Sequence, residues 1–306
     1  MAQVVGYALL PWERTEEAKA RPPVETIRQG LREIAEAGFN AFEALTRTTL
    51  TNDYGRRVMR YERWSSPPQT FSDSDLMSRL ATLLRMGEEA GLRLTTIFCD
   101  GEYVNPEIAQ AEFDQAAIVS RILAASGAKH LLVAGGPSPT RPGADHGADL
   151  RQLAARLSEI GREVAKSGVT LCFHPHIDTC VETPHDIDVF FGAADPDAVA
   201  MALDTAHVLA GGGDPVRVLR DHGDRVKYLH IKDIAMPAVP GPDFVGAARY
   251  RAFCDLGAGS VDFAEIGHVL RERPFEGPVV AELDFSDDPK RSARVARQYL
   301  RDAIGV

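Results

Sequence analysis

The stretch VKYLHIKD (residues 226–233) decides the fold, because a short apolar run of β type changes there to ionisable residues at its C-terminal end. Three other segments in the second half of the chain change in the same way, after residues 169–173, 199–203 and 278–281. The residues that directly follow the four runs are His174, Asp204, His230 and Glu282. A repeat of this kind predicts side chains that meet in one site at the edge of one sheet.

The alternation extends over the whole chain as predicted strands and helices. The eight predicted strands cover residues 4–9, 40–44, 93–98, 129–134, 169–173, 199–203, 226–229 and 278–281. The predicted helices cover residues 24–37, 75–90, 106–125, 150–164, 184–191, 214–222, 261–273 and 289–303. Strict alternation favours parallel β/α units, and eight of them close into a (β/α)8 TIM barrel whose active site lies at the C-terminal ends of the strands.

Length and composition favour one soluble globular domain over residues 1–306. A TIM barrel uses about 250 residues as a single unit, and the chain has 306, of which 44% are hydrophobic and 25% charged. The formal net charge of -10 disfavours nucleic acid and anionic membranes as partners. No CxxC spacing occurs among the four cysteines and no apolar signal segment follows Met1, so we expect reduced thiols and a cytoplasmic location.

Two stretches exceed ordinary loop lengths, at residues 46–74 and 234–259. Long loops in compact domains are usually lids or partner contacts. The first is a long loop insertion that is rich in aromatic residues and carries Arg56, Arg57, Arg60 and Arg63. It is expected either to close over an anionic or polyhydroxylated ligand or to form a contact in a homo-oligomer, and the sequence leaves both open.

The four residues at the strand ends form a plausible ligand set, because two imidazoles and two carboxylates suit a borderline divalent ion such as Mn, Co, Zn or Fe. His176 lies two residues after His174 in an extended segment, so both imidazoles are expected to face one cavity, with His176 toward the substrate. Asp204 could equally be a helix N-cap. Glu282 ends a buried strand, where a carboxylate must be paired, ligated or protonated.

Four further residues are candidates for contact with a substrate. Lys232 shares the direction of His230, so it either stabilises a developing oxyanion or is a solvated lysine at a strand end. His207 is close enough to Asp204 in sequence to touch the substrate or to orient a ligand. Glu43 belongs either to the floor of the site or to an ordinary salt bridge. Trp12 either stacks on a sugar face or plugs the barrel.

Nucleotide-binding and serine-hydrolase motifs are not found. The GAG at residues 257–259 lacks the third glycine of a dinucleotide fingerprint, and the GGG at residues 211–213 is not followed by the Lys-Ser/Thr of a phosphate loop. No GxSxG occurs. The sequence therefore gives no support for a nicotinamide or nucleotide cofactor.

Several motifs together resemble the sugar phosphate isomerase/epimerase superfamily, which has the xylose isomerase-like TIM barrel. They are HPH (174–176), VET (181–183), LDTAH (203–207), GDP (213–215), VKYLHIKD (226–233), LGAGSVDF (256–263) and GPVVAE (277–282). These segments look most like the inosose dehydratase branch. The resemblance is specific over residues 169–304 and general before that, although AGFNAFE (37–43) places Glu43 where the family tends to carry a site glutamate.

The resemblance implies one divalent ion, Mn or Co first and Zn, Mg or Fe as alternatives, and a sugar or cyclitol substrate in carbohydrate or inositol metabolism. The implied metal ligands are His174, Asp204, His230 and Glu282. The implied substrate contacts are Trp12, Glu43, His176, His207 and Lys232. One departure matters, because many epimerases of this superfamily have a glutamate where this chain has His174. A neutral imidazole there leaves a stronger Lewis acid, which favours dehydration over two-face epimerisation.

The expected reaction is abstraction of a proton α to a metal-bound carbonyl, followed by loss of water or by reprotonation. Glu282 or His176 would be the base, His207 the acid, and Lys232 would hold the enediolate. A sugar isomerase or epimerase with the same metal site is the alternative. Two other classes remain: a DNA-repair endonuclease of the same fold, which the net charge of -10 disfavours, and a non-catalytic barrel that binds a ligand or a partner subunit.

Overall fold

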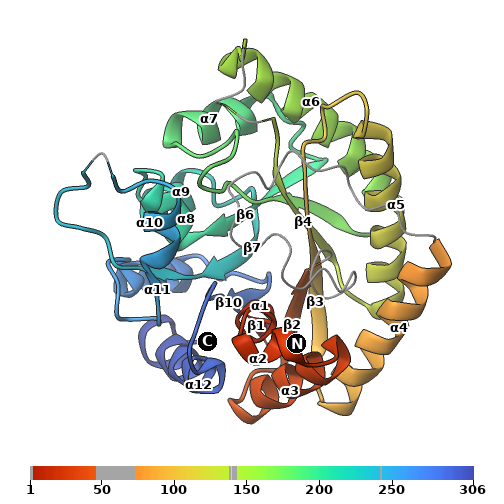
Figure 1. Cartoon of the computed structure of the whole chain (residues 1–306). Coiled ribbons are helices and arrows are strands. Elements are labelled where there is room, and N and C mark those ends of the chain that lie inside the picture. Colours follow the sequence, from red (N-terminus) through yellow and green to blue (C-terminus); the bar gives the residue numbers. More distant parts are fainter. Residues whose placement is uncertain (1–2, 46–72, 138, 140–142, 242) are drawn as a thin grey trace.

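The computed structural model describes residues 3–45, 73–137, 139, 143–241 and 243–306. It shows a closed barrel of parallel strands surrounded by helices (Figure 1), so the predicted (β/α)8 TIM barrel is confirmed. Residues 73–74 of the predicted long loop belong to a helix. The rest of that loop, and with it the predicted lid or oligomer contact, lies outside the described residues.

All eight predicted strands are present in the described part of the chain, with ends that move by a few residues. The barrel strands are β1 (Val5–Ala8), β2 (Ala41–Leu45), β3 (Arg93–Gly101), β4 (His130–Gly135), β5 (Thr170–Phe173), β6 (Val199–Asp204), β7 (Val226–Ile231) and β10 (Val279–Ala281). Neighbours in sequence are neighbours in the barrel, and β10 closes the ring by pairing with both β7 and β1. The C-terminal ends of all eight strands therefore meet on one side.

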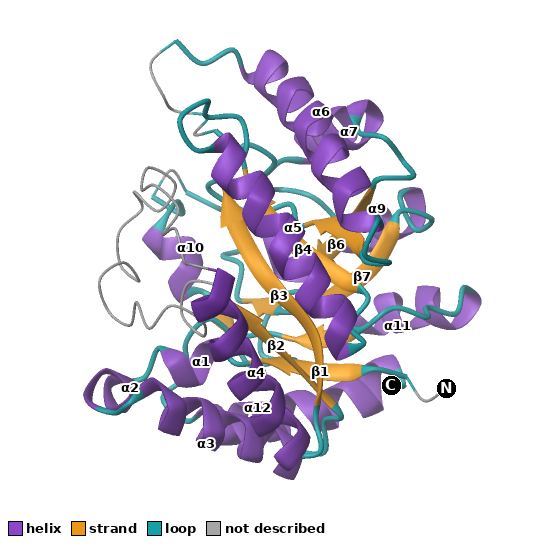
Figure 2. Ribbon diagram, turned by 90° about the vertical axis from the view of Figure 1, so that its right-hand side faces the viewer, coloured by secondary structure: helices purple, strands orange, loops and turns teal. Residues whose placement is uncertain are grey.

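The helices that cover the barrel also follow the prediction (Figure 2). They are α3 (Pro23–Glu36), α4 (Asp73–Glu89), α5 (Ala109–Ser126), α6 (His146–Ala165), α7 (Pro184–Ala193), α9 (Pro215–Asp221), α11 (Phe263–Glu272) and α12 (Pro289–Tyr299), which continues as a π-helix over Leu300–Ile304. Four short helices were not predicted, namely α1 (Leu10–Glu13), α2 (Glu16–Ala20), α8 (Thr205–Ala210) and α10 (Ala247–Arg251). They are too short for periodicity to reveal. Within the described residues, no helix combines the length and the apolar character needed to cross a membrane.

Local capping signals explain where these helices begin and end. Thr183 and Asp186 form a capping box at the start of α7, and the carboxylate of Asp145 accepts the Ala148 N–H at the start of α6. Gly127 ends α5 with φ of 82°, a left-handed conformation that glycine adopts without strain. The caps of α6 and α7 thus fix where these helices begin, and Gly127 ends α5 close to the next strand.

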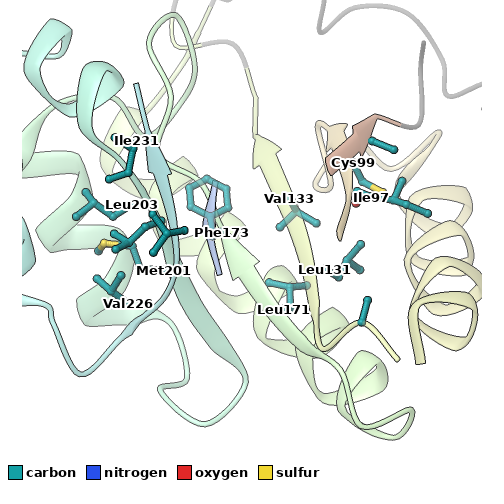
Figure 3. Close-up of a cluster of buried hydrophobic side chains, with 14 of the residues drawn as sticks. Ile97, Cys99, Leu131, Val133, Leu171, Phe173, Met201, Leu203, Val226 and Ile231 are labelled. Atoms are coloured by element: carbon teal, nitrogen blue, oxygen red, sulfur yellow. Dashed lines mark hydrogen bonds between the residues drawn. The ribbon is translucent and has the colours of Figure 1, made fainter. Parts of the chain in front are cut away.

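Alternate residues of the strands form two separate layers of core. One layer packs between the strands and helix residues such as Leu153 and Leu157. Its strand members labelled in Figure 3 are Ile97, Cys99, Leu131, Val133, Leu171, Phe173, Met201, Leu203, Val226 and Ile231. The other layer fills the inside of the barrel with Leu132, Cys172, Ala200, Ala202, Tyr228 and Val280. Because successive side chains on a strand point to opposite faces, both layers come from the same strands.

The stretch at residues 234–259 was predicted as a loop, and that prediction is wrong in part. It contains helix α10 (Ala247–Arg251) and a two-stranded antiparallel sheet of β8 (Asp233–Ile234) and β9 (Phe253–Cys254). The guanidinium of Arg249 donates to Asp178 and to Glu182, at 2.5 Å each, and so ties α10 to the loop after β5. Elements of two to five residues carry no readable periodicity, which is why the sequence did not reveal them.

The glycine-containing loop that follows β9 is fastened by a carboxylate of the chain itself. The two side-chain oxygens of Asp233 accept backbone N–H groups of Ile234, Gly257, Gly259 and Val261, at 2.9–3.2 Å. A Cβ atom on Gly259 would lie 2.2 Å from the Asp233 Oδ1, so the close approach requires glycine there.

His130 gives the fold a pH dependence that can be tested. It begins β4, its ring meets the Tyr228 ring edge-on at 5.8 Å, and burial lowers the pKa of His130 to about 4, with a smaller contribution from Lys227. An unfolded histidine titrates near 6.5. A lowered folded pKa means that the stabilisation is present above pH 6.5 and is lost as the pH falls toward 4. We expect the free energy of unfolding to drop by about 2 kcal/mol from this group between pH 6.5 and 4.5.

Urea unfolding of the wild type and of His130→Gln at pH 6.5, 5.5 and 4.5 measures this contribution. The variant should lose less stability over that range than the wild type. Equal losses in the two proteins would contradict the assignment.

Candidate metal centre

Each predicted ligand lies two residues beyond a member of the inner core layer. The pairs are Cys172 and His174, Ala202 and Asp204, Tyr228 and His230, and Val280 and Glu282. Residues two apart on a strand share a face. Because the core residues point into the barrel, the ligands two residues further along point into it as well, one layer closer to the C-terminal ends of the strands. Asp204 and His230 are also directly paired neighbours in the β6–β7 register. The four side chains therefore converge at the top of the barrel interior.

The distances between the ligand atoms fit a first-row divalent ion. One nitrogen or oxygen from each of the four residues lies within 4.8 Å of all the others. The Asp204 Oδ2 is 3.7 Å from the His174 Nε2 and 3.7 Å from the His230 Nδ1, and the Glu282 Oε2 is 3.0 Å from the His230 Nδ1. Ligand bonds of about 2.0–2.2 Å in a tetrahedral arrangement place donor atoms roughly 3–4 Å apart. The arrangement can thus hold an ion with small adjustments.

Neighbouring groups turn a lone pair of each imidazole toward the centre. The His174 Nδ1 lies 2.7 Å from the Pro175 carbonyl oxygen, which can only accept, so Nδ1 carries the proton and Nε2 is left to ligate. The His230 Nε2 lies 2.8 Å from the Glu43 carboxylate, which leaves the His230 Nδ1 on the side of Asp204 and Glu282. Partners of this kind fix the tautomer and the ring orientation of metal-bound histidines.

Asp204 is the N-cap of α8 and also a candidate metal ligand, so it combines the two interpretations that the sequence left open. Its Oδ1 accepts the backbone N–H of His207 at 2.8 Å and caps α8, while its Oδ2 has no hydrogen-bond partner although it is buried. Burial raises the pKa of Asp204 to about 7, against the opposing effect of Lys232. A buried carboxylate oxygen without a partner is costly. A divalent cation at the centre of the ligand set would satisfy it.

Glu43 supports the ligand set from the side of β2. Its Oε2 lies 2.8 Å from the His230 Nε2 and accepts the Tyr228 hydroxyl at 2.7 Å. Burial alone would lower the pKa of His230, but the carboxylates of Glu43 and Glu282 outweigh it and raise that pKa well above its ordinary value. Glu43 therefore orients His230, and it also lines the cavity beside the ligands. Its predicted contact with a substrate stays a prediction.

Lys232 is buried and fully engaged, so the interpretation as a solvated lysine is wrong. Its ammonium donates to the Glu282 Oε1 at 2.8 Å, forms an ion pair with Asp284 and lies 3.3 Å from the His207 Nε2. Burial lowers the pKa of Lys232, but Asp284 and Glu282 raise it above the ordinary value overall. Burial likewise raises the pKa of Glu282, and Lys232 with His230 brings it well below its usual range. Both groups are therefore charged at neutral pH.

A small cavity lies over the ligand set. Its polar lining is Arg14, Glu43, His174, His176, Glu282 and Asp284. His176 is half-buried there, and its ring stacks on that of His207 with centroids 3.7 Å apart. His207 lies behind it, away from the cavity lining, and burial lowers its pKa well below the ordinary value, so it is neutral. Of the predicted substrate contacts, Glu43 and His176 line this cavity, whereas His207 and Lys232 do not.

Trp12 is placed elsewhere, and the geometry gives no support for sugar stacking. Its indole N–H donates to the Glu33 carboxylate at 2.7 Å, its ring meets Tyr7 at 5.6 Å, and it packs against Gly30 of α3. The side chain is buried and does not line the cavity over the ligands. Trp12 instead joins α1 to α3, so the expectation that it faces the substrate is corrected.

Two residues of the cavity were missed by the sequence analysis, namely Arg14 and Asp284. Asp284 follows Glu282 by two residues, so the same spacing that identified the ligands could have found it. Arg14 comes directly after the four-residue helix α1. No periodicity indicates where its side chain points, so only the structure reveals it.

Comparison with known proteins agrees with this geometry. The family model of the xylose isomerase-like TIM barrel matches residues 31–303. The chain belongs to this family. Curated relatives include the inosose dehydratase of Clostridium tetani, 30% identical over 166 residues, and that of Lacticaseibacillus casei, 28% identical over 165 residues. The first match covers 51% of this chain and 55% of the relative, so the chain spans about half the length of the curated relatives it matches.

Solved structures match over nearly the whole chain and share the fold. They include a 3-keto-D-glucoside 4-epimerase from E. coli (TM-score 0.69, 19% identity, 98% of this chain and 99% of that one) and D-psicose 3-epimerase from Clostridium cellulolyticum (TM-score 0.70, 15% identity, 99% and 100%). A third is an IolI protein with a bound zinc atom (TM-score 0.68, 15% identity, 99% and 98%). The predicted xylose isomerase-like TIM barrel family is therefore confirmed, and the predicted likeness to inosose dehydratases is also found in the curated relatives.

The dual role of Asp204 leads to a test with Asp204→Asn. Asparagine keeps an oxygen for the α8 cap but removes the buried negative charge. A raised folded pKa means that the stabilisation from Asp204 is lost as the pH rises through about 7. At pH 8 the metal-free variant should therefore unfold at or above the temperature of the metal-free wild type.

The response to metal should go the other way. Mn²⁺ at 100 times its Kd stabilises the wild type by about 2.7 kcal/mol, a rise of roughly 5 °C in Tm, and Asp204→Asn should lose most of this rise in calorimetry. Asp214→Asn is the matched control, because Asp214 caps α9 away from the site. A full metal response in Asp204→Asn would show that Asp204 is not a ligand.

Proposed function

We propose that this chain is a divalent-metal-dependent enzyme that acts on a keto-sugar or keto-cyclitol by removing a proton α to the carbonyl group, with dehydration as the outcome. The observation that carries the proposal is the buried convergence of four ligand atoms within 4.8 Å, one of them the unpartnered Oδ2 of Asp204. The relatives named inosose dehydratase support the substrate class and the loss of water. Dehydratases belong to the lyases, so lyase chemistry is the first choice.

The donor set favours a first-row divalent ion. Two imidazoles and two carboxylates suit Mn or Co, with Zn, Mg or Fe as alternatives, and an IolI protein of the same fold carries a bound zinc atom. A divalent ion held by His174, Asp204, His230 and Glu282 supplies Lewis acidity toward a carbonyl oxygen. Glu43 and the Pro175 carbonyl hold the two imidazoles in the orientation that ligation needs.

We assign the base to His176, because its ring lines the cavity over the ligand set, whereas Glu282 is itself assigned as a metal ligand. Glu282 accepts from Lys232 through Oε1 and faces His230 through Oε2, so both of its oxygens have partners. His176 lines the cavity, and its Nδ1 lies 2.7 Å from the Ile177 carbonyl oxygen. That contact keeps the proton on Nδ1 and makes Nε2 the basic atom of the ring. His176 can thus take a proton from a substrate that lies over the ligand set.

Dehydration is favoured over epimerisation because the two reactions need bases on different numbers of faces of the substrate. Epimerisation needs proton transfer at both faces of one carbon, which a pair of opposed glutamates can provide. Among the described residues, the ligand set contains one glutamate, Glu282, and His174 takes the place that the family resemblance gives to a second glutamate in many epimerases. Removal of a proton by His176 and loss of the β-hydroxyl as water needs a base on one face only. An isomerase or epimerase remains the alternative, which the epimerase structures support.

Metal content and turnover test the ligand set together. We expect purified wild type to hold about one divalent ion per chain and His174→Ala and Glu282→Gln to hold much less, as measured by elemental analysis. His185→Ala is the matched control, because His185 is an exposed histidine on α7. Full metal content in His174→Ala and Glu282→Gln would overturn the site assignment.

A substrate screen of inososes, ketoses and 3-keto-glycosides separates the reaction classes. Enone absorbance that depends on the metal supports a dehydratase. Deuterium uptake from solvent without loss of water favours an isomerase or epimerase. Stoichiometric metal without turnover or exchange on any member of the screen favours the third class, a non-catalytic binding barrel.

His176→Gln tests the proposed base. Glutamine fills a similar space but cannot take the proton, so we expect kcat to fall by about 10²–10⁴-fold while metal content stays at the wild-type level. Steady-state kinetics and elemental analysis on the same preparations measure both. If kcat is retained in His176→Gln, the base is another group, with Glu282 the next candidate.

A further inference from the structure

Two cations lie beside the ligand set, and they differ in what they can offer a substrate. An ammonium group has three N–H donors, and those of Lys232 face Glu282, Asp284 and the His207 Nε2. The Lys232 Nζ also lies 4.2 Å from the centre of the Phe253 ring, and Lys232 does not line the cavity. Its contacts hold neighbouring side chains in place, and its ammonium lies outside the cavity lining.

Arg14 has the opposite combination of contacts. It lines the cavity, its side chain is only 4% exposed, and its Nη1 donates to the Asp284 Oδ1 at 2.5 Å and to the Asp284 carbonyl oxygen at 3.2 Å. The Phe285 ring lies against the guanidinium, 4.8 Å from its centre. The Arg14 Nε has no hydrogen-bond partner although it is buried. A buried donor without a partner is costly unless a ligand satisfies it.

We propose that Arg14 is a substrate-binding residue that donates to two adjacent oxygens of the molecule bound over the ligand set. A guanidinium has five N–H donors in a rigid fork, and Asp284 engages only Nη1. Within the described part of the chain the Nε has no hydrogen-bond partner, so the edge formed by Nε and Nη2 can offer its donors to two oxygens side by side. Asp284 and Phe285 are positioning residues in this proposal, because they fix the plane of the guanidinium.

The charges of the described residues indicate a neutral pair of hydroxyl groups for this edge. Four carboxylates surround the site, namely the buried Glu43, Asp204 and Asp284 and the partly buried Glu282. Arg14, Lys232 and a divalent ion supply four positive charges, which balance them. A substrate carboxylate would add an uncompensated negative charge inside the barrel, which is unfavourable. A vicinal diol of a cyclitol or sugar adds no charge and offers the same two oxygens.

Binding measurements test this inference without the need for turnover. Isothermal titration of the metal-loaded protein with myo-inositol, a neutral polyol, and with quinate, a polyol that carries a carboxylate, measures the two affinities. We expect the wild type to bind myo-inositol more tightly than quinate. Arg14→Ala and Arg14→Lys should each raise the Kd for myo-inositol by at least tenfold with unchanged metal content. Lysine keeps the charge and a partner for Asp284 but loses the two-donor edge.

Arg21→Ala is the matched control, because Arg21 lies on the nearby outer surface, pairs with Glu17 and does not line the cavity. It should bind myo-inositol as the wild type does. Unchanged affinity in both Arg14 variants, or no binding of myo-inositol by the wild type, would overturn the proposal. Tighter binding of quinate that is lost in Arg14→Ala would overturn the choice of a neutral diol.

The inference takes its substrate class from the proposed function, but the two can fail separately. If the protein turns over none of the keto compounds and still binds myo-inositol through Arg14, the enzymatic proposal falls and the binding site stands. If an inosose is dehydrated with the same KM by wild type and Arg14→Lys, the enzymatic proposal stands and the role of Arg14 falls.

Discussion

The two-residue period of the barrel strands is the constraint on which the site depends. Small and apolar side chains such as Ala202, Cys172 and Val280 face inward in one layer, and the ligands face inward in the next. A shift of one residue in any of these strands would send its ligand toward the surrounding helices and an outer-layer side chain into the barrel. Core packing and site geometry are therefore fixed by the same register, and the barrel cannot form correctly while the ligands are misplaced.

Charge balance is the second requirement, since the carboxylates at the top of the barrel are out of contact with bulk water. Lys232 and Arg14 share the carboxylate of Asp284, and Lys232 also pairs with Glu282. These cations leave Asp204 with one oxygen unsatisfied and with a pKa that burial raises to about 7. The excess of negative charge in the described residues matches the charge of one divalent ion. Binding of such an ion would therefore couple to folding stability.

The barrel and the ligand set could be predicted because both depend on periodic features of the sequence. Apolar runs that end in His174, Asp204, His230 and Glu282 reveal strand direction and strand end at once. Arg14 could not be predicted, because the short helix before it gives no direction to its side chain. The sequence also could not show that Lys232 is enclosed, since its partners Asp284 and His207 come from other segments. Trp12 was misplaced for the same reason, because its partner Glu33 lies on α3.

The segment between Asp233 and Val261 is fastened to the barrel at its two ends and near its middle. At its base, the carboxylate of Asp233 collects backbone N–H groups from both ends of the segment, and near its middle Arg249 bridges to Asp178 and Glu182. Such a segment can be lengthened, shortened or replaced during evolution without disturbing β7 or β10, provided that these anchor points survive. This variable segment lies beside the face of the barrel that carries the ligand set. Related proteins can therefore change what they recognise through this segment while the ligand set stays the same.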